Sequence, residues 1–237
     1  MKKSRNTLRI VSLVIFFLGV LFGAAFFASA TWGDLESNFY AFPSYGYRNA
    51  NVMRCPIFMT TGETGIVTAT FKNTMERRVR PNVRLIVSPA RMTVERISIE
   101  SGESQQLEWE VGWDEIGLRN FVFVKIITFA GYPLPNIEQT CGILVLNIPG
   151  MTGTQVALIP LICSLLFMFI GVGLWYLAER GMQTKYADIP RAMIMLTVVI
   201  ILGIVSAYMG WWLTGVILVA LLILMIGVVL GSILQGR

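Results

Sequence analysis

Two short runs, GIVTATFK at residues 65–72 and NVRLIVS at residues 82–88, decide the fold expected for the middle of this chain. In the first run, the apolar Val67, Ala69 and Phe71 alternate with a face that is mostly threonine. Alternation with a period of two is the pattern of a β-strand that buries one face. Helical periodicity is absent, and so many β-branched residues would make poor helices. The sequence therefore predicts β-structure here.

Similar runs recur between Val52 and Asn147, separated by turns such as Thr61-Gly62-Glu63. Short strands at this spacing predict an immunoglobulin-like (Ig-like) all-β sandwich of about seven strands. The expected strands are Arg54–Met59, Gly65–Lys72, Asn82–Ser88, Met92–Glu100, Gln105–Gly112, Asn120–Phe129 and Thr140–Asn147.

The rest of the chain has the composition of membrane helices. The whole sequence is 55% apolar and only 14% charged, whereas charged residues make up about a quarter of an ordinary soluble protein. Apolar stretches cover residues 10–30, 156–177, 192–209 and 213–234, and about 20 such residues span a bilayer. The sequence predicts an α+β membrane protein with an N-terminal segment (1–30), a β-domain with an aromatic lead-in (31–150) and a three-helix membrane region (151–237).

Charge sets the expected orientation. The excess of basic residues lies outside the β-domain, close to the helix ends, in Lys2, Lys3, Arg5, Arg9, Arg180, Lys185, Arg191 and Arg237. By the positive-inside rule, both termini lie in the cytoplasm and residues of about 31–152 lie outside a bacterial cytoplasmic membrane. Nucleic-acid binding is not expected, because a binder concentrates basic residues on its soluble face.

The N-terminal apolar segment has two interpretations. Ala28-Ser29-Ala30 fits a signal-peptidase site, whereas the apolar run before it is longer than the hydrophobic region of an ordinary signal peptide. Gly19 and Gly23 form a GxxxG step that favours a retained, packed helix. The chain then has four transmembrane helices, or three if the first is a cleaved signal.

Three features of the β-domain carry a family resemblance, namely the strand end Phe71-Lys72-Asn73-Thr74, the turn Ser101-Gly102-Glu103-Ser104 and the alternating Leu107, Trp109 and Val111. Residues 52–147 resemble bacterial Ig-like modules of the CARDB or NEW3 type. The resemblance implies a non-catalytic spacer or binding surface. The cysteine pair and the flanking apolar helices depart from that pattern.

Cys55 and Cys141 fall in the first and last expected strands. Terminal strands of such sandwiches often run side by side, and a pair held outside the cytoplasm oxidises, so we expect a disulfide. A redox or metal role would need a third ligand or a CxxC spacing, and the sequence has neither. Cys163, inside an apolar stretch, is expected to be a buried small apolar residue.

Two stretches are candidate binding surfaces. The first is a basic group beside a turn, formed by Arg77, Arg78, Arg80 and Arg84, with Arg91 nearby. It suits anionic headgroups or an acidic partner, and a solvated hairpin tip is the simpler interpretation. The second is the loop Tyr132-Pro133-Leu134-Pro135, which two prolines stiffen. It suits a partner, and it equally suits contact with the membrane or with the domain's own edge.

The apolar stretches contain no Asp, Glu, Lys, Arg or His, so an ion or proton pathway within this chain alone is not expected. Candidate helix-packing glycines are Gly19, Gly23, Gly171, Gly173, Gly227 and Gly231. Packing within the chain itself is the simpler interpretation of these glycines.

The chain contains no His, the commonest general base and metal ligand, and its carboxylates are scattered. We therefore expect no enzyme, no cofactor and no metal site. The favoured hypothesis is a non-catalytic accessory or scaffold subunit of the cell envelope, which presents an Ig-like domain to a protein partner and contacts membrane lipid. The alternatives are a surface module that binds glycan, peptide or envelope polymer, and a small channel or transporter component.

Overall fold

The computed structural model describes residues 2–41, 47–48, 53–88, 91–129, 137–179 and 188–235. The chain forms two compact units. The helical unit comprises Met1–Ala28, Leu158–Ala207 and Leu213–Arg237, and the β-unit comprises Ser29–Ala157 and Tyr208–Trp212. Helices α1 (Lys2–Glu36) and α2 (Gly153–Glu179) each contribute residues to both units.

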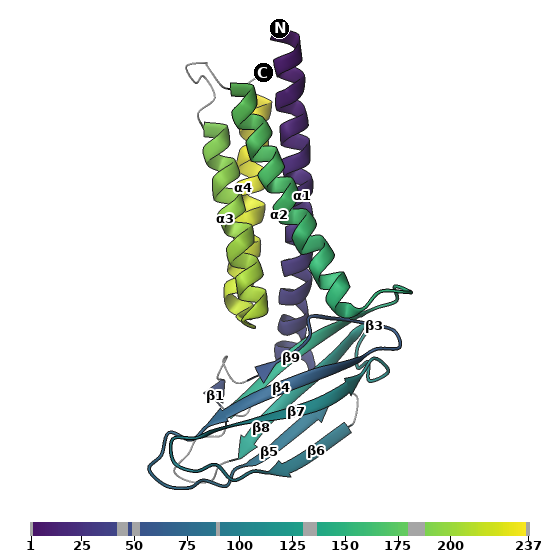
Figure 1. Cartoon of the computed structure of the whole chain (residues 1–237), viewed down its shortest axis with the longest axis vertical. Coiled ribbons are helices and arrows are strands. Elements are labelled where there is room, and N and C mark those ends of the chain that lie inside the picture. The colour runs from purple at the N-terminus through teal and green to yellow at the C-terminus, as the bar shows by residue number, and fades with distance from the viewer. Residues whose placement is uncertain are drawn as a thin grey trace. The chain divides into compact units, whose positions relative to one another are not determined.

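Within the described residues, the β-unit contains two β-sheets (Figure 1). The larger sheet has the order β1-β9-β8-β5-β6, and β3 also pairs with β9. Its strands are β1 (Tyr47–Arg48), β3 (Phe58–Thr60), β5 (Asn82–Val87), β6 (Arg91–Arg96), β8 (Phe121–Phe129) and β9 (Ile137–Leu146). The smaller sheet has the order β2-β4-β7, formed by Met53–Arg54, Thr64–Lys72 and Ser104–Gly112. Strands β1 and β3 pair with β9 in parallel, and the other pairs are antiparallel.

Side chains from both sheets share one hydrophobic core. The alternation predicted for residues 65–72 is present, because Val67, Ala69 and Phe71 are buried in the core. Strand β5 places Val83, Leu85 and Val87 in the same core. Removing each of the larger side chains from water stabilises the fold by roughly 1.5–3 kcal/mol. The remaining core residues come mainly from β7, β8 and β9, and include Trp109, Val111, Val122, Val124, Ile126, Ile143 and Val145.

The prediction of one strand at Arg54–Met59 is wrong. This stretch forms two short strands, β2 in the smaller sheet and β3 in the larger one. Between them lie Cys55, Pro56 and Ile57. Proline has no N–H for a ladder hydrogen bond, so it suits a point at which the chain leaves one sheet for the other.

Two other strand boundaries differ from the prediction by more than one residue. Strand β6 ends at Arg96, and Ile99 instead makes an isolated bridge with Val79. Strand β9 begins at Ile137, three residues before the predicted start.

Within the described residues, four helices are long and apolar enough to cross a membrane. They are α1, α2, α3 (Asp188–Tyr208) and α4 (Trp212–Gln235). Helix α1 continues beyond the predicted end at Ala30, through Ala28-Ser29-Ala30, and leads into the π-helical turn η1 (Ser37–Ala41). The Ser37 hydroxyl and the Asn38 amide both donate to the Asp34 carbonyl, at 3.0 and 2.6 Å. These hydrogen bonds satisfy a carbonyl that the ending α-helix leaves open.

Candidate functional site

The predicted disulfide between Cys55 and Cys141 is present, with the two Cα atoms 6.6 Å apart. Cys141 lies in β9 of the larger sheet, and Cys55 follows β2 of the smaller sheet. The bridge therefore joins the chain segment that crosses between the sheets to the larger sheet. The expectation of neighbouring terminal strands holds only for β3, which pairs with β9, and not for β2.

The turn between β3 and β4 binds the first turn of α2. The carboxylate oxygen Oε2 of Glu63 accepts hydrogen bonds from the backbone N–H groups of Thr60 at 2.9 Å and Gly153 at 2.7 Å. Thr152 and Gln155 form a reciprocal capping box, in which Gln155 Oε1 accepts from Thr152 N at 3.0 Å and Thr152 Oγ1 accepts from Gln155 N at 3.3 Å. The start of α2 is thus capped both locally and by the β-unit.

The end of α1 packs on β9 through two glycines. A Cβ atom on Gly33 would lie 2.9 Å from the carbonyl oxygen of Gly142, so only glycine permits this close approach. Nearby, Glu36 is 4% exposed. Its Oε1 accepts a hydrogen bond from Trp32 Nε1 at 2.8 Å and lies 3.7 Å from Arg119 Nη1. The last residues of α1 are therefore an integral part of the β-unit.

Strand β8 is buried on both faces from Phe121 to Ile126. One face contributes to the hydrophobic core, and the other carries the stacked rings of Phe121 and Phe123 followed by Lys125. Lys125 Nζ lies 2.7 Å from Glu138 Oε2, and both side chains are only 3% exposed. Breaking one partner of such a buried pair is strongly destabilising, although the pair itself is weak evidence for stability.

Asn73 joins the two turns that carry the family resemblance. Its side-chain amide donates to the carbonyl oxygens of Arg77, Ile99 and Glu100 at 2.8–3.0 Å, and its Oδ1 accepts from Met75 N at 2.9 Å. The backbone N–H groups of Asn73 and Gly102 donate to the Glu103 and Asn73 carbonyls, respectively. A buried polar residue therefore holds together the loops that follow β4 and β6.

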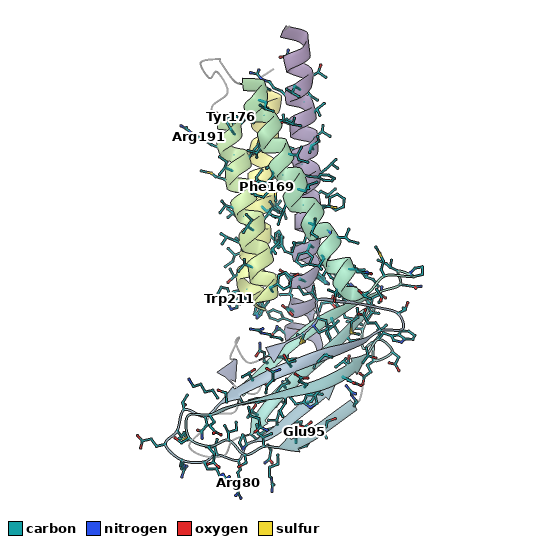
Figure 2. The ribbon with its side chains drawn as sticks, viewed as in Figure 1. Arg80, Glu95, Phe169, Tyr176, Arg191 and Trp211 are labelled. Atoms are coloured by element: carbon teal, nitrogen blue, oxygen red, sulfur yellow. A yellow bond between two sulfur atoms is a disulfide. The ribbon has the colours of Figure 1, made fainter. Side chains whose placement is uncertain are left out.

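The structure places the residues of the predicted basic group on different elements. Arg77, Arg78 and Arg80 are exposed on the loop between β4 and β5, where Arg78 makes an ion pair with Glu100. Figure 2 labels Arg80 on this loop. Arg84 lies on β5, with its guanidinium 5.0 Å from the ring centre of Phe129. Arg91, which was expected nearby, instead makes an ion pair of 2.8 Å with Glu115. The second predicted surface, Tyr132–Pro135, lies outside the described residues.

Arg84 belongs to a distinct surface on the outer side of the larger sheet, which we call the Arg84 face. The pairing register brings three rows of outward side chains together across β6, β5 and β8. Met92 and Val94 are 59% and 55% exposed, and Arg96 donates from Nε to Asn82 Oδ1 at 3.1 Å. The ninth position of these rows is Lys125, which is buried and paired with Glu138 of β9, so it is not part of the exposed surface. The Arg84 face consists of the other eight, namely Asn82, Arg84, Ile86, Met92, Val94, Arg96, Ile127 and Phe129.

The outer side of the smaller sheet has a different character. Strand β4 presents Thr64, Ile66, Thr68, Thr70 and Lys72, and its partners on β7 are Gly112, Glu110, Glu108, Gln106 and Ser104. Ile66, which is 58% exposed, is the one large apolar side chain among these ten described positions. A mixed, mostly polar face of this kind is an ordinary solvated surface.

In the helical unit, three of the predicted packing glycines lie at close helix contacts. Cβ atoms on Gly19, Gly23 and Gly171 would each come within 2.7 Å of Met168, Ser164 or Phe16. The Ser12 hydroxyl also donates to the Gly171 carbonyl at 2.7 Å. By contrast, a Cβ atom added to Gly173, Gly227 or Gly231 would meet nothing within 4 Å among the described residues.

The outward surface of the helical unit is apolar. Phe169 and Tyr176 of α2 are 66% and 68% exposed (Figure 2). An apolar groove of about 570 Å³ is lined by Ile226 of α4 and by residues of α1, namely Leu13, Val14, Phe17, Leu18, Val20, Leu21 and Ala24. Within the described residues, no group of three or more His, Cys, Asp or Glu side chains is placed to hold a metal ion.

Sequence patterns missed several of these residues. Glu63 sits in a Gly-Glu turn that resembles the Gly102-Glu103 turn, and only its closeness to the start of α2 in space distinguishes the two. Gly33 and Gly142 are isolated glycines in otherwise regular elements, which is a weak signal of close backbone approach.

No family model matches the sequence, and no curated protein matches it. Solved structures do match. The CARDB domain of the PF1109 protein from Pyrococcus furiosus, determined in complex with di-metal ions, is similar at 10% identity and a TM-score of 0.34. That match covers 40% of this chain and 90% of the CARDB domain. It is the kind of Ig-like module that residues 52–147 were predicted to resemble.

Two enzymes also contain a similar region. A cycloisomaltooligosaccharide glucanotransferase from Paenibacillus matches at 14% identity with a TM-score of 0.32, over 43% of this chain and 14% of the enzyme. Bacteroides uniformis β-glucuronidase 2 matches at 10% identity with a TM-score of 0.30, over 39% of this chain and 13% of the enzyme. The matched region is a small part of either enzyme, and neither activity transfers to this chain.

Proposed function

We propose that this chain is a non-catalytic accessory or scaffold subunit of a membrane complex, in which an Ig-like domain is presented to a protein partner outside the cytoplasm. The two sheets with one shared core support an Ig-like β-sandwich. The four long apolar helices support an integral membrane protein with both termini on one side, and the basic residues near the helix ends support the cytoplasmic side. A disulfide persists in oxidising compartments, so the bridge between Cys55 and Cys141 supports an extracytoplasmic place for the domain.

The observation that carries the scaffold role is the attachment of helix ends to the β-unit. Glu63 binds the first turn of α2, and the close approach of Gly33 to Gly142 seats the last turns of α1. A module that only captures soluble ligands needs no fixed position and can work on a flexible tether. Helix ends that belong to the fold of the β-unit instead suit a domain that is built together with its membrane helices, as in a subunit of a membrane complex.

Retention of α1 is part of the proposal. Within the helical unit, α1 covers the Gly171 carbonyl through Ser12 and packs Phe16 against Gly171. Cleavage after Ala30 would remove these contacts and would cut α1 inside its helical span, just before the turn that contains Gly33. An N-terminal sequence or intact mass of the protein from native membranes tests this directly, because retention predicts a chain that still contains residues 1–30.

The function is tested by purifying the full chain from its native membranes in mild detergent. A scaffold subunit co-purifies with a defined partner at a fixed ratio, and a lone monomer under these conditions contradicts the proposal. Orientation is tested with an impermeant maleimide on intact cells. Glu76→Cys should be labelled and Gln183→Cys protected, and the reverse pattern would overturn the topology.

A further inference from the structure

The Arg84 face has the composition of a protein interface. Its eight side chains include four apolar residues, two arginines and an aromatic ring, and none is acidic. Interfaces are enriched in Arg, Met and aromatic residues and depleted in Lys, Glu and Asp. The outer side of the smaller sheet, in the same unit, is rich in Thr and Glu instead. The difference is therefore specific to one face and is not a property of the whole domain.

Arg84 itself retains binding capacity. Its guanidinium is held over the ring of Phe129, which fixes the direction of the fork. Its Nε is buried and has no hydrogen-bond partner among the described residues. Because this Nε is out of reach of solvent, an incoming carboxylate would accept from the two Nη groups of the same guanidinium, in a charge-assisted pair. Arg96, on the same face, brings the net charge of the eight side chains to +2.

The strand edge next to this face is less suited to binding. Strand β6 ends the path of the larger sheet, but it carries Arg91, Glu95 and Arg96. Charged residues on an edge strand oppose the addition of another strand. Arg91 and Glu95 are also bound to β7 and its following turn, through the Glu110 carbonyl, Glu115 and the Trp109 indole. A partner is therefore expected on the face and not on the edge.

We propose that the Arg84 face docks an acidic segment of a protein partner, in which a carboxylate pairs with Arg84 and flanking apolar side chains cover Met92 and Val94. Charge complementarity sets the chemistry, because the eight exposed side chains carry +2 and the buried Lys125–Glu138 pair beside them adds no net charge, so the face selects an anionic occupant. The guanidinium fork and its aromatic support favour a planar carboxylate held bidentately. This inference rests on the proposed function and names the surface through which that function acts.

The test uses the full chain in living cells, with the photoreactive residue p-benzoyl-phenylalanine at position 94. The matched control places the same residue at position 66, because Val94 and Ile66 are β-branched strand residues of nearly equal exposure on the two outer faces. The expected result is a cross-link from position 94, and not from position 66, to one other protein. Mass spectrometry should place the cross-linked peptide in a segment that contains Asp or Glu.

Arg84→Glu should lower the yield of that cross-link by roughly tenfold or more, since a like charge then faces the carboxylate. Arg54→Glu, an exposed position on β2 of the smaller sheet, should leave the yield unchanged. Formation of the Cys55–Cys141 bridge, read from mobility without reductant, shows that each variant has folded.

Other outcomes overturn the assignment. Cross-links from position 94 to lipid would make the face a membrane contact, and cross-links to a second copy of this chain would make it a self-interface. If Arg84→Glu leaves the yield of the cross-link from position 94 unchanged, the proposed pairing of Arg84 with a carboxylate is wrong. If a partner still co-purifies with the full chain but position 94 gives no cross-link, the scaffold role stands and the assignment of the Arg84 face as the docking surface is wrong. If no partner co-purifies and no cross-link forms, both proposals fail.

Discussion

Oε2 of Glu63 accepts a hydrogen bond from the backbone N–H of Gly153 at 2.7 Å, although 90 residues separate the two in sequence. Partial burial alone would raise the pKa of Glu63. The hydrogen bonds from Thr60 N, Gly153 N and the Thr60 hydroxyl outweigh burial and hold the pKa below its ordinary value of 4.5. The N-terminus of α2 also carries partial positive charge, which favours a carboxylate at this place.

Glu63→Gln should destabilise the β-unit, because a neutral amide oxygen binds helix N–H groups less strongly than a carboxylate does. Loss of a comparable helix cap costs about 1 kcal/mol. Thermal unfolding of the detergent-solubilised chain, followed by circular dichroism, measures the change. Glu103→Gln is the matched control, since Glu103 occupies the other Gly-Glu turn and is exposed. An equal effect of both substitutions would contradict the role of Glu63.

The same contact predicts a pH dependence. The folded-state pKa of Glu63 lies below its unfolded value, so its contribution is complete above about pH 4.5 and is lost as the pH falls through the folded-state pKa. The difference in stability between the unsubstituted chain and Glu63→Gln should therefore shrink between neutral pH and about pH 3. Urea unfolding midpoints of the two proteins at both pH values measure it. If the difference in stability between the two proteins instead grows toward acid pH, folding does not lower the pKa of Glu63.

Removal of the disulfide should have the largest effect of any conservative change in the β-unit. The bridge closes a loop of 86 residues, and in the chain-entropy model such a loop is worth roughly 4–5 kcal/mol. Cys55→Ser should lower the denaturant midpoint and abolish its sensitivity to reductant. Cys163→Ala should change neither property, since Cys163 is a free cysteine in the helical unit. If reductant does not change the denaturant midpoint of the unsubstituted chain, that result would argue against the disulfide.

Periodicity predicted what is regular in this fold. The alternation at residues 65–72 correctly assigned Val67, Ala69 and Phe71 to the core, and uninterrupted apolar stretches correctly located the four long helices. Neither pattern shows where the chain changes sheets, so Arg54–Met59 was predicted as one strand. The partners of Glu63, Asn73 and Arg84 were also beyond prediction, because each contact joins residues that only the folded chain brings together.

Asn73→Ala should destabilise the β-unit by about 2–3 kcal/mol, because buried carbonyl groups lose their donor. Asn73 is 3% exposed, so water does not replace the amide readily. Asn73→Asp should be at least as harmful, since a carboxylate would face the Ile99 and Glu100 carbonyl oxygens that now accept hydrogen bonds. Thermal unfolding compares both variants with Asn120→Ala, an exposed control position. A neutral Asn73→Ala would mean that the two turns are held together by other contacts.

Gly142→Ala should unseat the end of α1 from β9, because the added Cβ would overlap the carbonyl group of Gly33. Crowding of this kind costs about 1–3 kcal/mol when the neighbour is backbone and cannot rotate away. Gly173→Ala is the control, since nothing among the described residues lies within 4 Å of its added Cβ. In a helix interior, alanine is favoured over glycine by about 1 kcal/mol, so this control should be neutral or stabilising. Thermal unfolding of the two variants in the same detergent measures the contrast. If Gly142→Ala and Gly173→Ala are equally stable, the close approach of Gly33 to Gly142 does not hold the end of α1 in place.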